Sequence, residues 1–236
     1  MRACISVLVT RWRDSLVDAT HDDEATRWVR RRRDAVMAIA GLFVVTLGLI
    51  VVRHGSVSAF EEDVFRAVND LPGALYPVLW PFQQLGVIVI GPIVALIAAL
   101  LRRWRLAAMV LIATVLKLGV ERVVKVLVTR ERPGTSIGSD VHRRGDVSLS
   151  GESFVSGHAV LVAALAGIIT PYLRGRWKIV PWVVVAMVMV TRVYVGAHNP
   201  LDVICGAALG LVIAGVLNLA FGVPAPVPER ATVTGR

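Results

Sequence analysis

The sequence predicts an all-α membrane protein, a bundle of six transmembrane helices with an additional interfacial segment. Hydrophobic residues make up 56% of the chain, charged residues only 18%, and the mean hydropathy is +0.68. These values favour a membrane protein over a soluble one. The apolar residues also gather in stretches of about 20 bounded by charges, the length that a helix needs to cross a bilayer core of ~30 Å.

Six stretches meet this description. Their approximate bounds are 35–52, 84–101, 106–128, 154–173, 179–195 and 201–221. Each is expected to be helical because backbone polar groups cannot stay unpaired in lipid. The predicted organisation is a cytoplasmic segment at 1–33, a six-span domain at 34–222 and a proline-containing disordered tail at 223–236.

The stretch 71–82 is apolar but contains Pro72, Pro77 and Pro81. Prolines remove backbone donors and interrupt a regular helix, so this stretch is not expected to cross the membrane as a regular span. It is predicted to be an interfacial or re-entrant segment. A plain surface loop is an equally open alternative.

Positive charge predicts the topology. Lysine and arginine cluster in three places, namely 30–33, 102–105 and 174–178. Cytoplasmic loops are enriched in these residues, so both termini are expected in the cytoplasm. The loop 129–153 falls on the outer side by this alternation, yet it holds Arg130, Arg132, Arg143 and Arg144, which calls for a local reason.

Charge and cysteine content exclude several classes. The net charge of +9 is spread over short clusters between apolar stretches, which favours anionic lipid or phosphate as a partner over nucleic acid. Cys4 and Cys205 lack partners at metal-ligand spacing, so neither a disulfide framework nor a metal or cofactor is expected. The apolar run 5–9 is too short for a cleaved signal peptide.

Three short patterns on the predicted outer side hold most of the unusual polar residues. They are Lys125, six residues, Arg132 and Pro133; then Ser156, Gly157 and His158; and finally Arg192, five residues, His198, three residues and Asp202. Each pattern alone is weak, but their order together is a strong signal.

This set resembles the type 2 phosphatidic acid phosphatase family, within the vanadium haloperoxidase-like superfamily. The wider segments Ser-Phe-Val-Ser-Gly-His-Ala at 153–159 and Gly-Ala-His-Asn-Pro-Leu-Asp-Val at 196–203 resemble it as well. The resemblance covers roughly 117–210. Val155 stands where the family usually has proline and Thr191 where it has serine; the first change is expected to loosen the start of the fourth span.

The resemblance implies a division of labour between two histidines. His198 would attack phosphorus and form a phosphohistidine, while Asp202 would accept the other ring N–H and hold the attacking nitrogen unprotonated. His158 would protonate the leaving oxygen and then take a proton from the hydrolytic water.

A phosphate group also needs several fixed positive donors around one point. Lys125, Arg132 and Arg192 can supply them, and the Ser156 hydroxyl and the backbone N–H groups around Gly157 would add a helix N-terminal anion site. No metal is then required.

Other polar residues are expected to be structural. Lys117, Glu121 and Lys125 share one helix face and are expected to form a buried ion-pair ladder. Arg143 and Arg144 are expected on a solvated or headgroup-binding surface. Gly206 and Gly210 should mark close packing against a neighbouring helix.

The leading hypothesis is a multi-pass plasma-membrane lipid phosphatase, with its site on the extracytoplasmic face, acting on a lipid phosphomonoester or pyrophosphate. Phosphatidic acid, phosphatidylglycerol phosphate and polyprenyl (pyro)phosphate present the same group, so the sequence leaves the lipid open, as it does the oligomeric state. The alternatives are a phosphotransferase with an alcohol acceptor and a non-catalytic lipid-phosphate binding or transport protein.

Overall fold

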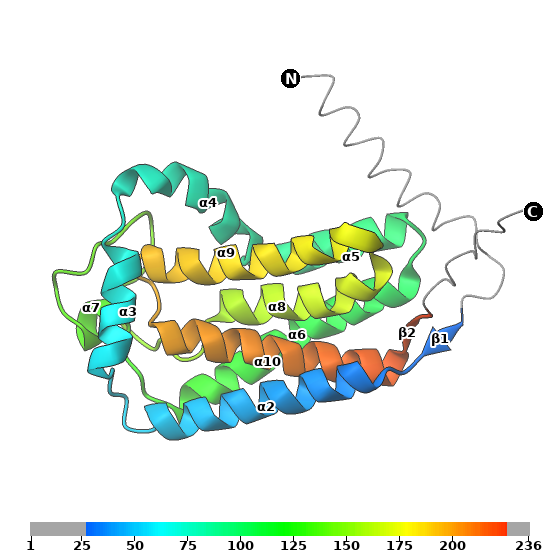
Figure 1. The fold of residues 1–236 in the computed structure, drawn as a ribbon, viewed down its shortest axis with the longest axis horizontal. Helices are drawn as coiled ribbons and strands as arrows, with labels where there is room; N and C mark the ends of the chain where they lie inside the picture. Colours follow the sequence, from blue (N-terminus) through cyan, green and yellow to red (C-terminus); the bar gives the residue numbers. More distant parts are fainter. Residues whose placement is uncertain (1–26, 226–236) are drawn as a thin grey trace, which may run out of the picture.

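A computed structural model describes residues 27–225 as a bundle of helices lying side by side (Figure 1). The predictions made for the residues before 27 and after 225, including Cys4 and the lack of a cleaved leader, lie outside the described residues. Residues 223 and 224, assigned to the tail from sequence, form strand β2 (Val223–Pro224), which pairs antiparallel with β1 (Trp28–Val29).

Six helices correspond to the six predicted spans. They are α2 (Arg32–Val52), α5 (Ile90–Leu100), α6 (Trp104–Leu127), α8 (Gly157–Ile169), α9 (Val180–Tyr194) and α10 (Pro200–Phe221). The connecting elements are α3 (Ala59–Asn69), η1 (Gly73–Leu75), α4 (Tyr76–Leu85), α7 (Pro133–Ser136), η2 (Thr170–Tyr172) and η3 (Gly175–Ile179). The all-α fold class predicted from sequence is therefore confirmed.

The helices differ in how well their length and apolar composition suit a membrane span. In the described part of the chain, α2, α9 with η3, and α10 are each long and apolar enough to cross a bilayer, and the pair α4–α5 would make a fourth span. Helix α6 is 24 residues long but carries several charges, and α8 is only 13 residues long and mostly buried. Charged residues in a span usually face a protein interior or cavity; Lys117, Glu121 and Lys125 of α6 do so here, whereas Arg105 and Arg122 are exposed.

Helix α10 lies at the centre of the bundle and packs most extensively on α8 and α2. Close approach depends on small residues: a Cβ at Gly210 would lie 2.4 Å from the Val160 carbonyl oxygen, and one at Gly206 would lie 2.7 Å from that of Ser156. The prediction that these glycines mark packing against a neighbouring helix is thus confirmed, and the neighbour is α8.

The predicted span 84–101 is wrong as one helix. Helix α4 ends at Leu85, α5 begins at Ile90, and their axes are bent by 65°. The stretch 71–82, for which a plain loop was an open alternative, instead contributes η1 and most of α4, with Pro77 in the first helical turn, where proline costs least. In Figure 1 α4 arches away from the bundle, consistent with an interfacial or re-entrant segment.

Helix α3 was not anticipated from sequence. It lies across one end of the bundle (Figure 1) and contacts α9 and α10. The Ser58 hydroxyl accepts a hydrogen bond from the Glu61 N–H at its start, a common N-cap. Glu61 and Phe65 are buried beneath the helix, whereas Phe60 is 78% exposed.

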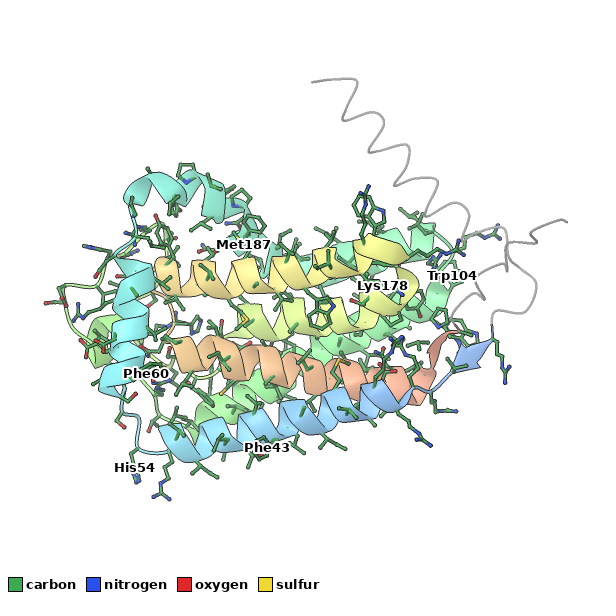
Figure 2. The ribbon with its side chains drawn as sticks, in the orientation of Figure 1. Phe43, His54, Phe60, Trp104, Lys178 and Met187 are labelled. Carbon is green, nitrogen blue, oxygen red and sulfur yellow. The ribbon has the colours of Figure 1, made fainter. Side chains whose placement is uncertain are left out.

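The basic clusters gather at the opposite end of the bundle. Arg30 Nε donates to the Leu219 carbonyl oxygen at 2.7 Å, and Arg105 NH1 donates to that of Phe221 at 3.0 Å. In Figure 2 Trp104 and Lys178 lie at this end, and His54 and Phe60 lie at the other. The two ends therefore differ in charge as the predicted alternation of loops requires.

Candidate active site

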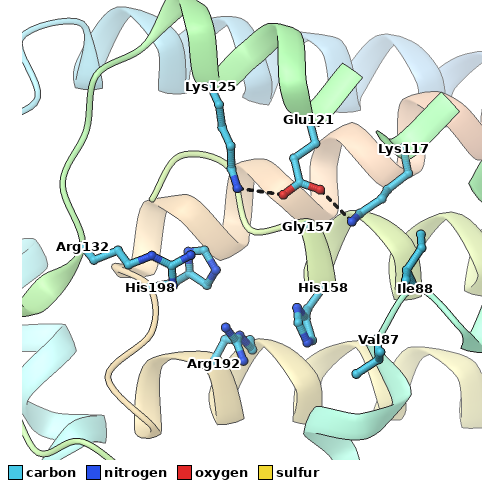
Figure 3. A pocket seen from close by; sticks show the side chains of 11 residues that line it. Val87, Ile88, Lys117, Glu121, Lys125, Arg132, Gly157, His158, Arg192 and His198 are labelled. Carbon is cyan, nitrogen blue, oxygen red and sulfur yellow. Dashed lines mark ion pairs between the residues drawn. The ribbon is translucent and has the colours of Figure 1, made fainter. Parts of the chain in front are cut away.

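A cavity of about 310 Å³ lies where α6, α8, α9 and the start of α10 approach one another (Figure 3). Its lining brings together residues that are far apart in sequence. They are Gly86, Val87, Ile88, Lys117, Glu121, Lys125, Arg132, Gly157, His158, Arg192 and His198. Six of the eight residues singled out from sequence as catalytic or phosphate-binding line this cavity; the exceptions are Ser156 and Asp202.

One wall of the cavity is an ion-pair ladder on α6. Lys125 Nζ lies 2.8 Å from Glu121 Oε1, and Lys117 Nζ lies 2.6 Å from Glu121 Oε2. The predicted ladder is confirmed. All three side chains also line the cavity, so the ladder is part of the site's surface as well as a support for Lys125.

Two arginines complete the cationic surface. Arg132 follows α6, and its NH1 donates to the Ala197 carbonyl oxygen at 3.0 Å, directly before His198 in the chain. Arg192 comes from the last turn of α9 and is only 6% exposed. Together with Lys117 and Lys125, these arginines give the cavity four cationic side chains from three segments.

Two glycines let other side chains reach the cavity. A Cβ at Gly86, in the bend between α4 and α5, would lie 2.5 Å from His158 Cδ2. A Cβ at Gly157 would lie 2.3 Å from Glu121 Oε2. Gly157 therefore admits the Glu121 carboxylate to the first turn of α8, and Gly86 allows the bend to pack directly against the His158 ring.

His198 lies in the tight turn between α9 and α10. Gly196 has φ of +79°, a conformation that favours glycine, and a Cβ there would meet Val141 Cγ1 at 3.0 Å. Helix α10 begins two residues after His198, at Pro200, a position where proline suits a helix start. The turn thus holds His198, which is 3% exposed, at a fixed helix entrance.

The partner of His198 differs from the one expected. Asp202 Oδ2 is 3.8 Å from His198 Nδ1, too far for a hydrogen bond. Ser153 Oγ lies 3.3 Å from the same nitrogen and donates to Asp202 Oδ2. The Asn199 N–H also donates to Asp202 Oδ2, at 2.8 Å.

These contacts indicate the tautomer of His198. Because the Ser153 hydroxyl hydrogen is directed at Asp202, Ser153 Oγ can accept from His198 Nδ1–H but cannot donate to that nitrogen. A neutral ring protonated on Nδ1 leaves Nε2 with a free lone pair. In the sequence, Ser153 stands out only as the first residue of the segment 153–159. Its position before the Ser-Gly-His pattern does not indicate that its hydroxyl lies between His198 and Asp202.

A second buried cation was also missed. Arg130 is 1% exposed; its NH1 donates to Asp202 Oδ1 at 2.8 Å and its NH2 to Glu61 Oε2. Glu61 Oε1 in turn accepts the Leu201 N–H at 2.8 Å. This network ties α3 to the start of α10, and it explains one of the arginines that violate the loop charge rule.

Two further expectations concern residues outside the cavity. Ser156 is fully buried and does not line the cavity, and its N–H donates to the Asp202 carbonyl oxygen at 3.0 Å. Arg144, expected on a solvated or headgroup-binding surface, is half-buried and contacts other segments of the chain. Its NH1 donates to the carbonyl oxygens of Asn69 and Tyr194, and its guanidinium stacks 4.1 Å from the Tyr194 ring centroid.

Burial, together with nearby Arg192 and Arg132, lowers the pKa of His198 from 6.5 to about 4, and Asp202 offsets only part of this effect. We therefore expect the ring to stay neutral between pH 7 and 5. Because the unfolded chain takes up this proton near pH 6.5, the same shift lowers the free energy of unfolding as the pH falls from 6.5 towards 4.

Nuclear magnetic resonance of protein labelled at histidine Cε1 measures this directly. The signal missing from His198→Ala identifies the residue among the five histidines of the chain. A His198 signal that titrates with a midpoint of 6 or higher would contradict the expectation.

The fold and the cavity define a polytopic helical membrane protein with a cationic site that holds two histidines. A family model described as the PAP2 superfamily matches residues 102–223, just over half of the chain. This range contains all eight residues singled out from sequence. The protein belongs to the PAP2 superfamily, and hence to a family of membrane phosphatases.

Known proteins support the same fold. The crystal structure of LpxE from Aquifex aeolicus superposes with a TM-score of 0.62 at 22% identity, covering 69% of this chain and 96% of that chain. A PAP2 type phosphatidylglycerolphosphate phosphatase from Bacillus subtilis gives a TM-score of 0.60 at 22% identity, covering 76% and 94%.

A lipid A 4'-phosphatase from Porphyromonas gingivalis is 38% identical over 63 residues. The match spans 25% of this chain and about a quarter, 26%, of that relative's length. It is a likeness over one segment of the two proteins.

Proposed function

We propose that the protein is an integral membrane lipid phosphatase that hydrolyses a lipid phosphomonoester or diphosphate through a phosphohistidine on His198. The observation that carries the proposal is one cavity in which His198 and His158 lie together with Lys125, Arg132 and Arg192. Phosphoryl transfer depends on positioning and on stabilising charge at the equatorial oxygens, and this cavity offers both.

In the first step Lys125, Arg132 and Arg192 hold the phosphoryl oxygens. His198 Nε2 attacks phosphorus; the N–P bond forms as the bond to the lipid oxygen breaks. His158, acting from the first turn of α8, gives a proton to the departing oxygen. Ser153 and Asp202 keep the His198 ring oriented and protonated on Nδ1.

In the second step water replaces the lipid alcohol. The His158 imidazole takes a proton from the water, the water oxygen attacks phosphorus, and the N–P bond breaks to release phosphate and restore neutral His198. Binding without catalysis would not need a nucleophile with its own orienting network. Lys125, Arg132 and Arg192 supply the charge that a metal ion supplies elsewhere, so the proposed reaction needs no metal.

The proposed sidedness follows from charge. The basic clusters and the paired strands β1 and β2 lie at one end of the bundle, and the turn between α9 and α10, which holds His198, lies at the other (Figure 1). Since cytoplasmic loops are enriched in lysine and arginine, we place both termini in the cytoplasm and the site on the extracytoplasmic face. Cysteine labelling of His54→Cys and Lys178→Cys from outside the cell distinguishes the two ends.

A panel of lipid phosphates assayed side by side tests the function. Purified protein in detergent is expected to release phosphate from at least one of phosphatidic acid, phosphatidylglycerol phosphate and polyprenyl phosphate or diphosphate, with EDTA present. Complete loss of activity in EDTA that a divalent ion restores would overturn the metal-free mechanism. No release from any lipid would contradict the phosphatase assignment. Repeating the assay with an alcohol acceptor and analysing the products separates hydrolysis from phosphotransfer.

A further inference from the structure

Lys117 is a charged residue placed deep in a span. It lies in the middle of α6, two helical turns from Lys125, and only 8% of it is exposed. Ionisable groups at such a depth are costly and usually mark a substrate or ion pathway. Glu121 already pairs with Lys125, so Lys117 is not needed to support Lys125.

The charge of the cavity exceeds what one phosphate needs. Four cations and one carboxylate line it, which gives a formal charge of +3, or +4 when His158 carries the proton that it donates in the first step. A phosphate monoester carries about −1.5 to −2 at neutral pH. A substrate with a single phosphate would therefore leave positive charge unmatched among side chains that are largely buried, where that is unfavourable.

The lining changes in character from one end of the cavity to the other. In Figure 3 Arg132 and His198 lie at one end, His158 and Lys117 lie further along, and Val87 and Ile88 lie beyond them. Lys117 and His158 both lie in the part of the cavity away from Arg132 (Figure 3). Lys117 is thus on the His158 side.

Attack by His198 in line with the breaking bond sends the leaving group away from His198, towards His158 and Lys117. We propose that Lys117 binds a second phosphate, carried by the leaving group next to the transferred one, with the apolar chain beyond it against Val87 and Ile88. This inference rests on the proposed function and narrows its substrate to a lipid diphosphate or a lipid whose head group holds a second phosphate.

The ladder leaves Lys117 able to do this. An ammonium group has three N–H donors, and the ion pair with Glu121 Oε2 uses one of them. Glu121 holds the ammonium group towards the cavity, and Lys117 can donate to a phosphate oxygen while that pair stays intact. A lysine suits this position because it acts as a compact point charge without a fixed geometry.

Catalysis with matched lipids tests the proposal. The pairs are farnesyl phosphate with farnesyl diphosphate, and phosphatidic acid with phosphatidylglycerol phosphate. Lys117→Met should lower kcat/KM for the member with two phosphates by about tenfold or more, the effect of one lost charged partner, and leave the other member nearly unchanged. Lys117→Arg should retain the preference. The pair that shows the selective loss identifies the source of the second phosphate.

A binding experiment separates this inference from the phosphatase assignment. In His198→Ala protein, which cannot turn over, we expect inorganic pyrophosphate to bind more tightly than phosphate, and Lys117→Met to remove that preference. An equal loss with both members of each lipid pair, or an unchanged pyrophosphate preference, would overturn the role of Lys117. Arg122→Gln, an exposed cation on the same helix that does not line the cavity, is the matched control and should behave as wild type.

Discussion

Replacing His198 with alanine should lower lipid phosphate hydrolysis by about 10³-fold or more, because the variant has no atom to accept the phosphoryl group. His198 Nε2 is the free nitrogen of a ring whose Nδ1 contacts Ser153. Steady-state phosphate release measures the loss. Rapid quenching adds a second readout, since wild-type protein should yield an acid-labile phosphoryl adduct that the variant lacks.

The matched control is His54→Ala. His54 lies at the same end of the molecule but is exposed and away from the cavity (Figure 2). It should retain wild-type rates. Hydrolysis at a normal rate by His198→Ala, with the protein intact by size-exclusion chromatography, would show that another group attacks phosphorus and would end the phosphohistidine mechanism.

Replacing Arg130 with methionine should cost about 3–5 kcal/mol of stability, the effect of removing one partner from a buried ion pair. The Arg130 side chain has no exposed surface and lies between the carboxylates of Glu61 and Asp202. Its loss would leave two buried negative charges without their cation. The change in the free energy of unfolding is measured by titrating each protein with a denaturing detergent. Activity should fall too, because Asp202 loses a contact that fixes its position.

Two further variants serve as controls for the Arg130→Met measurement. Arg143→Met removes an exposed cation whose ion pair with Asp146 is on the surface, and such pairs contribute little. Adding Glu61→Gln to Arg130→Met removes one of the orphaned charges and should recover part of the lost stability. Wild-type stability in Arg130→Met would refute the idea that this network holds the site together.

Much of the site was predictable because its chemistry depends on residue types at fixed spacings. His158, Arg192 and His198 do meet in one cavity with Lys125 and Arg132, although they come from α6, the loop after it, α8, α9 and the turn before α10. The ladder was predictable as well, since residues four apart share a helix face. The Ser156 hydroxyl was not, because burial depends on the neighbouring helix α10 and cannot be judged from a motif.

The sequence by itself determined the helical membrane class, the charge difference between the two ends and most of the residues that line the cavity. These follow from local properties, namely apolar length, loop charge and spacing. Only the tertiary structure decided that Ser153 lies between His198 and Asp202, that Arg130 connects Asp202 to Glu61 on α3, and that Lys117 reaches the cavity. Each joins segments 45 or more residues apart or depends on a neighbouring helix, and no local pattern records such a contact.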